Sequence, residues 1–248
     1  MAGSLAPVTA SFRLAYVPGV TPAKWVRTWH ERLPSVPLTL VRVAAATAAD
    51  IVRRRDADAV LLRLPVDRTG LHAIPLYTEA TVVVVPKDHF LAAAESLTAA
   101  DLADDVVLHP LDDVLEWTEA LPGKPALDRP ATTEDAVELV AAGIGLLVVP
   151  QSLARLHHRK DLTYRPFPDA PASQVALSWL EEETGELTEQ LIGIVRGRTV
   201  NSSRGSQPAE KAPKAEKPKP KVADKRKPAA AQSRRGTPKG SGKPRRRG

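Results

Sequence analysis

Hydroxyl side chains stand at four points where the sequence predicts that a helix begins. Thr21 precedes a proline, Thr47 and Thr132 are each followed by an aspartate three residues later, and Ser152 follows a proline by two residues. The first turn of a helix leaves backbone N–H groups without partners, and these groups attract anions together with the helix dipole. The pattern therefore predicts a site for a small anionic molecule, with Thr21, Thr47, Thr132 and Ser152 as candidate ligand-binding residues.

The same spacing has a second explanation that needs no ligand. In the pattern Thr-x-x-Asp, which Thr47 forms with Asp50 and Thr132 forms with Asp135, hydroxyl and carboxylate can cap their own helix. Such a cap stabilises a protein by roughly 0.5–2 kcal/mol. The sequence leaves both the ligand-binding and the capping interpretation open.

Other chemistries find little support in the sequence. It contains no cysteine, which excludes disulfides and thiol chemistry. Ser152 lacks the flanking glycines of a nucleophile elbow, and the glycine patterns of nucleotide-binding loops do not occur. The histidines show no metal-ligand spacing; they are His30, His72, His89, His109, His157 and His158. We therefore expect no catalytic residue, no metal and no cofactor.

The candidate hydroxyls must be positioned by strands and helices that alternate along the first 65 residues. The predicted elements are strands at 12–17, 38–43 and 59–64, a helix that begins at Thr21 and Pro22, and a helix over 47–55. This order predicts a parallel sheet with helices on both faces. In such a sheet the helix starts face a cleft beyond the carboxyl ends of the strands.

The alternation then breaks and restarts, which predicts a second lobe. A long apolar run over 72–89 is predicted to be one strand. The later predicted elements are strands at 105–110, 144–150 and 174–180 and helices around 113–121, over 132–143, from Gln151 to about His158, and over 184–198. A chain that leaves the first lobe at about 86 and returns at about 172 makes that lobe discontinuous.

Three stretches carry a resemblance to a known family. They are FRLAYVPGVTPAKWVRTWHERLPSVPLTLV (12–41), IPLYTEATVVVVPKDHFLAAAESLTAADLADDVVL (74–108) and TTEDAVELVAAGIGLLVVPQSLA (132–154). In this order and at this spacing they resemble the effector-binding domain of LysR-type transcriptional regulators. The pieces VVPKDHFLA and LVAAGIGLLVVPQS are the most specific, and the resemblance covers most of residues 11–198.

The resemblance implies an α/β, two-lobed fold of the type 2 periplasmic-binding-protein kind. Each lobe would be a βα sandwich with a mainly parallel sheet. The domain would span 11–198, with lobe I at about 11–86 and 172–198 and lobe II at about 87–171.

The resemblance also implies a ligand site and a partner. In the family, helix starts of both lobes contact the effector, and by motif these positions are Thr21, Thr47, Thr132 and Ser152. First-lobe helices of the family pair with the second lobe of another subunit, so a homodimer is expected. Trp29 has helical spacing with Trp25 and Leu33 and is predicted to be a core residue. The family's winged helix-turn-helix precedes the effector domain and has no counterpart in the ten residues before the first predicted strand.

Residues 199–248 form a basic tail that the family pattern does not include. They hold 16 Lys and Arg against 3 Asp and Glu, a net charge of +13, whereas residues 1–198 carry a net charge of −7. High charge, low hydrophobicity and repeated prolines predict a disordered segment. The tail is expected to bind DNA or RNA without sequence preference, by counterion release. The candidate contacts are Lys217, Lys219, Lys221, Lys225, Arg226, Lys227, Arg234, Arg235, Arg245, Arg246 and Arg247.

The sequence favours a cytoplasmic regulatory protein that binds a small anionic effector and, through its tail, nucleic acid. No stretch approaches the ~20 apolar residues of a membrane span, and the first residues lack the features of a signal peptide. One alternative is a cytosolic solute-binding or sequestering module with no DNA role. A further alternative is an enzyme on this two-lobed fold, for which the sequence shows no triad, metal set or paired acids.

Overall fold

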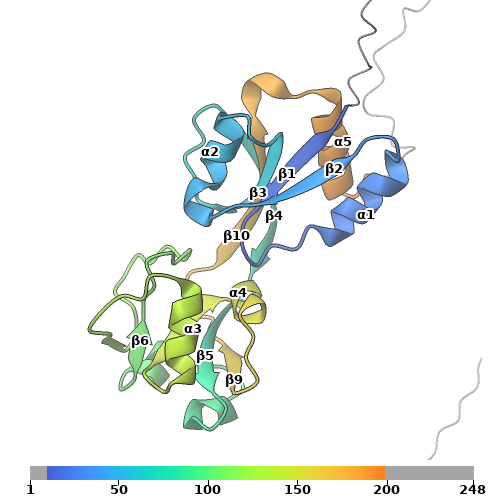
Figure 1. The fold of residues 1–248 in the computed structure, drawn as a ribbon. Coiled ribbons are helices and arrows are strands. Elements are labelled where there is room, and N and C mark those ends of the chain that lie inside the picture. Colours follow the sequence, from blue (N-terminus) through green and yellow to red (C-terminus); the bar gives the residue numbers. More distant parts are fainter. Residues whose placement is uncertain (1–9, 199–248) are drawn as a thin grey trace, which may run out of the picture. The chain divides into compact units, whose positions relative to one another are not determined.

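The computed structural model of the chain describes residues 10–198 (Figure 1). The predicted basic tail, with its candidate nucleic-acid contacts, lies outside the described residues. The described elements form two five-stranded sheets, and separate apolar cores pack against each sheet. We call the bodies built on these sheets lobe I and lobe II. The predicted two-lobed α/β fold is therefore confirmed.

Lobe I is built on a sheet with the strand order β2-β1-β3-β10-β4. Its strands are β1 (Phe12–Tyr16), β2 (Leu38–Arg42), β3 (Ala59–Leu64), β4 (Leu71–Glu79) and β10 (Ser173–Leu180). β1 pairs in parallel with β2 and β3, as the predicted helical crossovers require, and β10 pairs antiparallel with β3 and β4. The sheet is mixed rather than mainly parallel, because β10 returns from lobe II and runs against both neighbours.

Three α-helices cover this sheet: α1 (Ala23–Arg32), α2 (Ala48–Arg53) and α5 (Glu186–Val195). Short 3-10 segments, η1 (Ala45–Thr47) and η4 (Glu181–Glu183), precede α2 and α5. α1 and α5 pack against each other, α2 packs on β3 and β10, and Figure 1 shows α2 on the opposite side of the sheet from α1 and α5. Because helices cover both faces, β3 is buried from Ala59 to Arg63.

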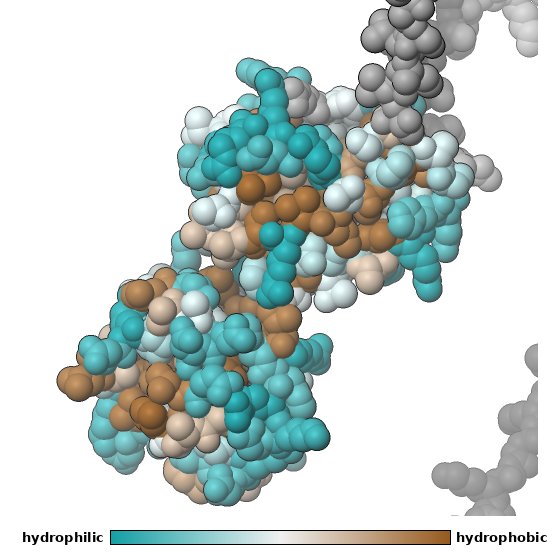
Figure 2. Space-filling view, viewed as in Figure 1, coloured by the Kyte–Doolittle hydropathy of each residue, from teal (hydrophilic) through white to brown (hydrophobic). Residues whose placement is uncertain are grey.

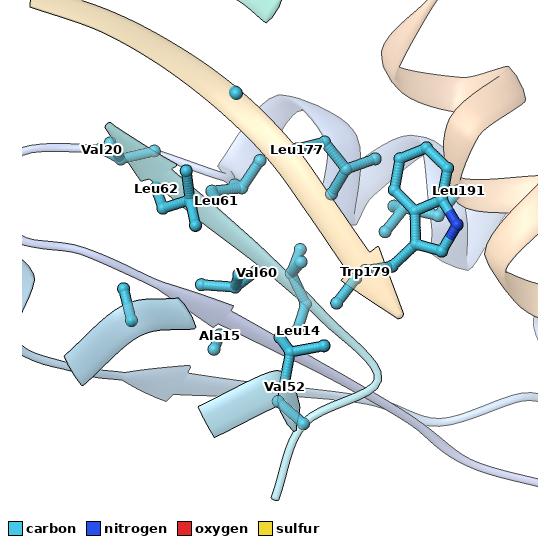
Figure 3. Packing of buried hydrophobic residues seen from close by; sticks show 14 of the residues in the cluster. Leu14, Ala15, Val20, Val52, Val60, Leu61, Leu62, Leu177, Trp179 and Leu191 are labelled. Atoms are coloured by element: carbon cyan, nitrogen blue, oxygen red, sulfur yellow. The ribbon is translucent and has the colours of Figure 1, made fainter. Parts of the chain in front are cut away.

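The core of lobe I is formed by apolar side chains from the central strands. Figure 3 shows side chains of this core, among them Leu14 of β1, Val60 of β3, Leu177 of β10 and Leu191 of α5, and all four are buried. Trp29, predicted to be core, is fully buried, and its Nε1 donates to the carbonyl of Val36 at 3.0 Å. Burial of one such aliphatic side chain stabilises the fold by about 1.5–3 kcal/mol. This core fixes the strand ends that carry the candidate site.

Lobe II is built on a sheet with the strand order β7-β6-β8-β5-β9. Its strands are β5 (Thr81–Pro86), β6 (Val106–Leu108), β7 (Lys124–Pro125), β8 (Leu146–Pro150) and β9 (Leu162–Pro166). β6 pairs in parallel with β7 and β8, whereas β5 pairs antiparallel with β8 and β9. This sheet is mixed as well.

The four successive valines of β5 are buried because both faces of the lobe II sheet are covered. Val82 and Val84 face a core formed with α3 (Thr133–Ala141) and α4 (Gln151–Leu156). Val83 and Val85 face a second core beside the 3-10 segments η2 (Phe90–Ala93) and η3 (Ala99–Leu102). Successive residues of a strand point to opposite faces, so a continuous apolar run is the expected signature of a doubly covered strand.

The apolar run over 72–89 forms two strands, not the single strand that the sequence predicts. β4 and β5 are separated at Ala80, whose carbonyl accepts from the backbone N–H of Gln151 at 2.9 Å. Thr81 Oγ1 donates to the carbonyl of Pro171 at 2.7 Å. The chain therefore leaves lobe I at Ala80. The sequence predicts that it leaves at about 86, which would place β5 in lobe I, but β5 belongs to lobe II. The chain returns just before β10, near the predicted position 172.

The helix predicted around 113–121 does not form. The Asp113 carboxylate accepts from the backbone N–H of Leu115 at 3.0 Å and from Trp117 Nε1 at 3.0 Å. An aspartate that binds the amide two residues later stabilises a turn at the expense of a helix. The sequence also does not predict β7 or β9, of which β7 is two residues long.

Candidate functional site

A cavity of about 490 Å³, here called the cleft cavity, lies between the lobes at the carboxyl ends of the parallel strands of lobe I. Lobe I contributes Pro18 after β1, the alanines 44–46 after β2 and Pro65 after β3. Lobe II contributes residues 111–116 after β6 and the start of α3. The volume falls within the range of about 300–1,000 Å³ that is usual for small-molecule sites.

A second cavity of about 350 Å³, here called the side cavity, adjoins the first. Its lining consists of Tyr16, Pro18, Gly19, Val20, Thr21 and Arg42 from lobe I and Ser152, Arg155 and Leu156 from α4. Pro18 and Arg42 line both cavities. The two cavities therefore share one wall, at the carboxyl ends of β1 and β2.

The structure brings three of the four predicted ligand-binding residues to these cavities. Thr132 lines the cleft cavity, Thr21 and Ser152 line the side cavity, and Thr47 lines neither. Thr47 Oγ1 lies 3.4 Å from the carbonyl of Ala44 in its own chain segment. The contact of these hydroxyls with a ligand stays a prediction.

Thr132 caps its own helix, as the second interpretation of the sequence requires. Its Oγ1 accepts from the Asp135 N–H at 3.1 Å, and the Asp135 carboxylate accepts from the Thr132 N–H at 3.1 Å. Asp112 adds a further carboxylate, which accepts from Thr133 Oγ1 at 2.8 Å. The positive end of the α3 dipole is therefore already compensated by acidic side chains of the protein.

The other helix starts are less regular than predicted. α1 begins at Ala23 with Pro22 at the capping position, so Thr21 stands outside the helix and does not cap it. Thr47 is at the capping position of α2, but its side chain makes no capping hydrogen bond. α2 and α4 have six residues each, so fewer peptide dipoles add up along their axes. The case for an anion site must therefore come from side-chain charge.

Arg42 supplies that charge, and sequence reasoning missed it. It is the last residue of β2, it is exposed, and its side chain forms no hydrogen bond or ion pair with any other residue between 10 and 198. In the side cavity it is joined by Arg155, whose Nε donates to the Tyr164 hydroxyl at 3.3 Å. No carboxylate is among the residues that line the side cavity. The only signal in the sequence is a basic residue at the carboxyl end of an apolar strand.

A buried ion pair lies behind the cleft. Arg63, in β3, donates from Nε to Glu79 Oε2 at 2.8 Å, and the two side chains are only 4% and 5% exposed. Glu79 is the last residue of β4, and Oε2 also accepts from Ser173 Oγ at 2.9 Å, at the start of β10. Burial and, after it, the negative charge of Glu79 raise the pKa of Tyr77 above its ordinary value. Glu79 thus links β3 to β4 and β10, the two strands that connect the lobes.

Arg63 also reaches the wall of both cavities. Nη1 donates to the carbonyl of Pro18 at 2.9 Å, and Nη2 donates to Ser152 Oγ at 3.1 Å. Among the described residues, the second of these is the one side-chain hydrogen bond that links the strands of lobe I to α4 of lobe II. The signal in the sequence is a single charged residue inside the apolar run AVLLRL, which sequence reasoning passed over.

Gly19 allows the loop after β1 to approach α4 closely. Its φ is +82°, a region that L residues with a side chain rarely adopt. A Cβ at this position would lie 2.7 Å from Ser152 Oγ and 3.0 Å from Arg63 Nη2. Both the backbone conformation and the space therefore require glycine here.

The lobe II wall of the cleft cavity is acidic; its carboxylates are Asp112, Asp113, Glu116 and Glu134. Asp113 is held by the N–H groups of Leu115 and Trp117 and lies 3.3 Å from His109 Nε2. Glu116 and Glu134 are exposed, and their side chains make no hydrogen bond or ion pair with other described residues. No lysine or arginine of lobe II lines this cavity. The two walls of the cleft therefore carry opposite charges.

The arginine run at the end of α2 is not a free basic patch. Arg53 pairs with Asp50 at 3.0 Å and Asp67 at 3.2 Å, and Arg54 pairs with Asp56 at 3.1 Å. Figure 2 shows a hydrophilic surface around α2, in keeping with these exposed pairs. Because the acids neutralise the arginines locally, this surface gives no reason to expect nucleic acid at α2.

Two further observations bear on the class of protein. Across residues 10–198, no cluster of three or more His, Asp or Glu side chains is placed to hold a metal ion. In the same part of the chain, no helix combines the length and apolar character needed to cross a membrane.

Two lobes joined by crossing strands, with a cavity of small-molecule size between them at the strand ends, define a two-lobed ligand-binding domain. Within this class, comparison with protein families gives a definite assignment. The chain belongs to the LysR substrate binding domain family, whose model matches residues 8–199. The resemblance stated from the sequence is thereby confirmed.

Curated relatives of the chain are regulators. It is 28% identical over 149 residues to the HTH-type transcriptional regulator AlsR of Bacillus subtilis (strain 168), which covers 56% of this chain and 49% of the relative. It is 32% identical over 162 residues to a probable hydrogen peroxide-inducible genes activator of Mycobacterium avium, which covers 61% of this chain and 52% of the relative. The chain thus spans about half the length of these relatives.

Solved structures share the fold. The oxidized form of OxyR matches with a TM-score of 0.63 at 23% identity, over 77% of this chain and 96% of that one. The BenM effector binding domain with its effector benzoate matches with a TM-score of 0.62 at 19% identity, over 77% of this chain and 92% of that one. At these identities the likeness establishes the fold.

Proposed function

We propose that this chain is the effector-binding part of a transcriptional regulator and that it binds a small molecule in the cleft between its lobes. The observation that carries the proposal is the cavity of about 490 Å³ at the carboxyl ends of β1, β2 and β3, where folds of this kind bind ligands. Membership of the LysR substrate binding domain family and the regulators among its relatives support a regulatory rather than a catalytic role.

We propose further that the effector carries an anionic group and that this group binds at Arg42. The Arg42 side chain has no partner among residues 10–198 and lies at the wall of a cavity, so it is available for a carboxylate, and Arg–carboxylate pairs can be bidentate. Thr21 and Ser152 line the same cavity and can donate hydroxyl hydrogen bonds to such a group. Thr132 lines the cleft cavity beside it, whereas Thr47 has no place in this arrangement.

Binding of carboxylates tests this assignment. We expect at least one member of a panel of aliphatic and aromatic carboxylates, benzoate included, to bind the chain in isothermal titration calorimetry. The Arg42→Ala variant should bind that compound about tenfold more weakly, because a charge-assisted hydrogen bond is lost.

The matched control for this experiment is Arg27→Ala. Arg27 lies on α1, is exposed and lines neither cavity, so its removal should leave carboxylate affinity as in the wild type. Equal affinity of the Arg42→Ala variant and the wild type would contradict the placement of the anionic group. Failure of every carboxylate to bind would contradict the anionic effector itself.

For the tail, we propose binding to DNA or RNA without sequence preference. Support comes from composition: residues 199–248 carry 16 Lys and Arg against 3 Asp and Glu. If about six of these charges meet phosphates, the slope of log affinity against log salt is near −5, so doubling the salt lowers affinity about 30-fold. A homodimer in the cytoplasm is also part of the proposal; the homodimer rests on the family resemblance alone.

Gel-shift titrations on duplex DNA test the role of the tail. In one variant the eleven candidate cations listed above, from Lys217 to Arg247, are all changed to glutamine, and we expect it to lose measurable binding at low salt. In the control each of these lysines becomes arginine and each arginine becomes lysine, so the charge is kept and binding should persist. Equal binding by the glutamine variant and the wild type would contradict the role of the tail, and absence of binding by the wild type would favour a solute-binding module with no DNA role.

A further inference from the structure

The charges that line the two cavities differ in sign, and this limits the kind of molecule that fits. The side cavity is lined by Arg42 and Arg155 and by no carboxylate. The cleft cavity is lined on its lobe II side by four carboxylates and by no lysine or arginine of that lobe. Arg42 and Pro18 belong to both linings, so one molecule can reach both regions.

Arg63 does not neutralise the negative charge of the acidic wall. Arg63 also lines the cleft cavity, but its charge is matched by Glu79, with Nε and Oε2 2.8 Å apart and both side chains buried. Its two terminal nitrogens, Nη1 and Nη2, donate to the Pro18 carbonyl and to Ser152 Oγ. A ligand therefore meets Arg42 as the one arginine of the cleft lining that has no partner among the described residues.

Carboxylates of the acidic wall are left without a charged partner among the described residues. Glu116 and Glu134 are exposed and have no partner within residues 10–198, and Asp112 accepts a single hydroxyl hydrogen bond, from Thr133. Asp113, which binds Leu115, Trp117 and His109, and His157 are the remaining titratable groups of lobe II in this lining. A molecule with only negative charge would be attracted at Arg42 and repelled by the opposite wall, because like charges at short range disfavour each other.

Apart from its charged side chains, the lining of the cleft cavity is largely apolar. Lobe I contributes the alanines 44–46 and Pro65, and lobe II contributes Val114, Leu115 and Leu153. An aliphatic body can replace water along these side chains, which is favourable in proportion to the apolar area buried. The linings of the two adjoining cavities thus combine an arginine, apolar side chains and an acidic wall.

We infer that the effector is a zwitterion of the amino-carboxylate class, with its carboxylate at Arg42 and its ammonium group toward Glu116, Glu134 and Asp112. This inference rests on the proposed function, because it names the ligand class of the same site. It adds the recognition of a positive group, which the proposed anionic site alone does not require.

Three probes with the same carbon skeleton test the inference by calorimetry on the full chain: ε-aminocaproate, hexanoate and hexylamine. A shorter set, γ-aminobutyrate, butyrate and butylamine, covers a smaller separation of charges. In at least one set the zwitterion is expected to bind about tenfold more tightly than either singly charged compound, because it gains a charge-assisted contact at each end.

Variants assign the two ends of the ligand. The double variant Glu116→Gln with Glu134→Gln should lose the preference for the zwitterion and bind the plain carboxylate more tightly, since repulsion is removed. Arg42→Ala should weaken the zwitterion and the carboxylate and leave the amine unaffected. Glu95→Gln is the matched control, because Glu95 is an exposed acid of lobe II that lines neither cavity.

The outcomes separate this inference from the proposed function. If the plain carboxylate binds as tightly as the zwitterion, the zwitterion class is overturned and an anionic effector at Arg42 still stands. If the double variant keeps the preference, the acidic wall is not the ammonium site and the inference is overturned. If no compound of either set binds, the inference also falls, and the carboxylate panel decides separately on the proposed function.

Discussion

Replacing Arg63 with methionine is expected to lower the free energy of unfolding by about 3–5 kcal/mol. The substitution keeps most of the volume of the side chain but leaves the Glu79 carboxylate buried without its cation, and these side chains are 4% and 5% exposed in the native domain. It also removes the donors to the Pro18 carbonyl and to Ser152. Urea denaturation of variant and wild type, followed by circular dichroism, measures the difference.

A second substitution shows whether the lost stability comes from the unpaired charge. The double variant Arg63→Met with Glu79→Gln should recover a large part of the loss, because most of the cost of breaking a buried pair is the charge left behind. Arg13→Met is the matched control: the Arg13–Asp58 pair is 42% and 33% exposed, and loss of an ion pair of this kind costs about 1 kcal/mol or less. A double variant as unstable as Arg63→Met would refute this account of the pair.

The stability-restored double variant also separates folding from ligand binding. Arg63 positions the Pro18 carbonyl, which belongs to a residue shared by both cavities, and Ser152 of the opposite lobe. If these contacts hold the loop after β1 and α4 in their relative positions, the double variant should bind carboxylates weakly even though its stability has returned. Arg63 is thus a positioning residue, which acts on the effector through the loop after β1 and through α4.

The strands and helices that sequence reasoning predicted best are those decided by local pattern. β3 has the predicted bounds 59–64, and the Thr132 cap forms as its spacing allows, because hydroxyl and carboxylate are three residues apart on one helix start. The sequence predicts one strand over the apolar run 72–89. A strand buried on both faces has a continuous apolar pattern, so the pattern does not mark the break at Ala80. That break is set by a hydrogen bond from Gln151, about 70 residues later, which no local pattern records.

The candidate site was predicted only in part, for the same physical reason. Helix starts are visible in sequence, so Thr21, Thr132 and Ser152 were placed near cavities. The charges of the cavities depend on which ionic side chains find a partner after folding. Arg63 is neutralised by Glu79, 16 residues away, whereas Arg42 has no partner among the described residues. Both appear in the sequence as an arginine near the end of an apolar strand, so the sequence alone gives no basis for telling them apart.

Gly19→Ala is expected to destabilise the domain by about 2–4 kcal/mol and to weaken carboxylate binding at the side cavity. With φ at +82°, alanine brings backbone strain of about 1–2 kcal/mol. Its Cβ would also lie 2.7 Å from Ser152 Oγ and 3.2 Å from Leu153 Cδ2, and overpacking of this kind costs typically 1–3 kcal/mol. The loop after β1 must then move away from α4, and the lining formed by Pro18 and Thr21 moves with it.

Comparison with Gly70→Ala isolates the part of this effect that comes from the contact between the lobes. Gly70 has φ at +72°, but nothing lies within 4 Å of a Cβ built there. This variant should therefore show the backbone strain alone and bind carboxylates like the wild type. Chemical denaturation and calorimetry on both variants measure the two quantities. If Gly19→Ala and Gly70→Ala cost the same stability and bind ligand equally well, then the approach of the loop to Ser152 has no part in shaping the site.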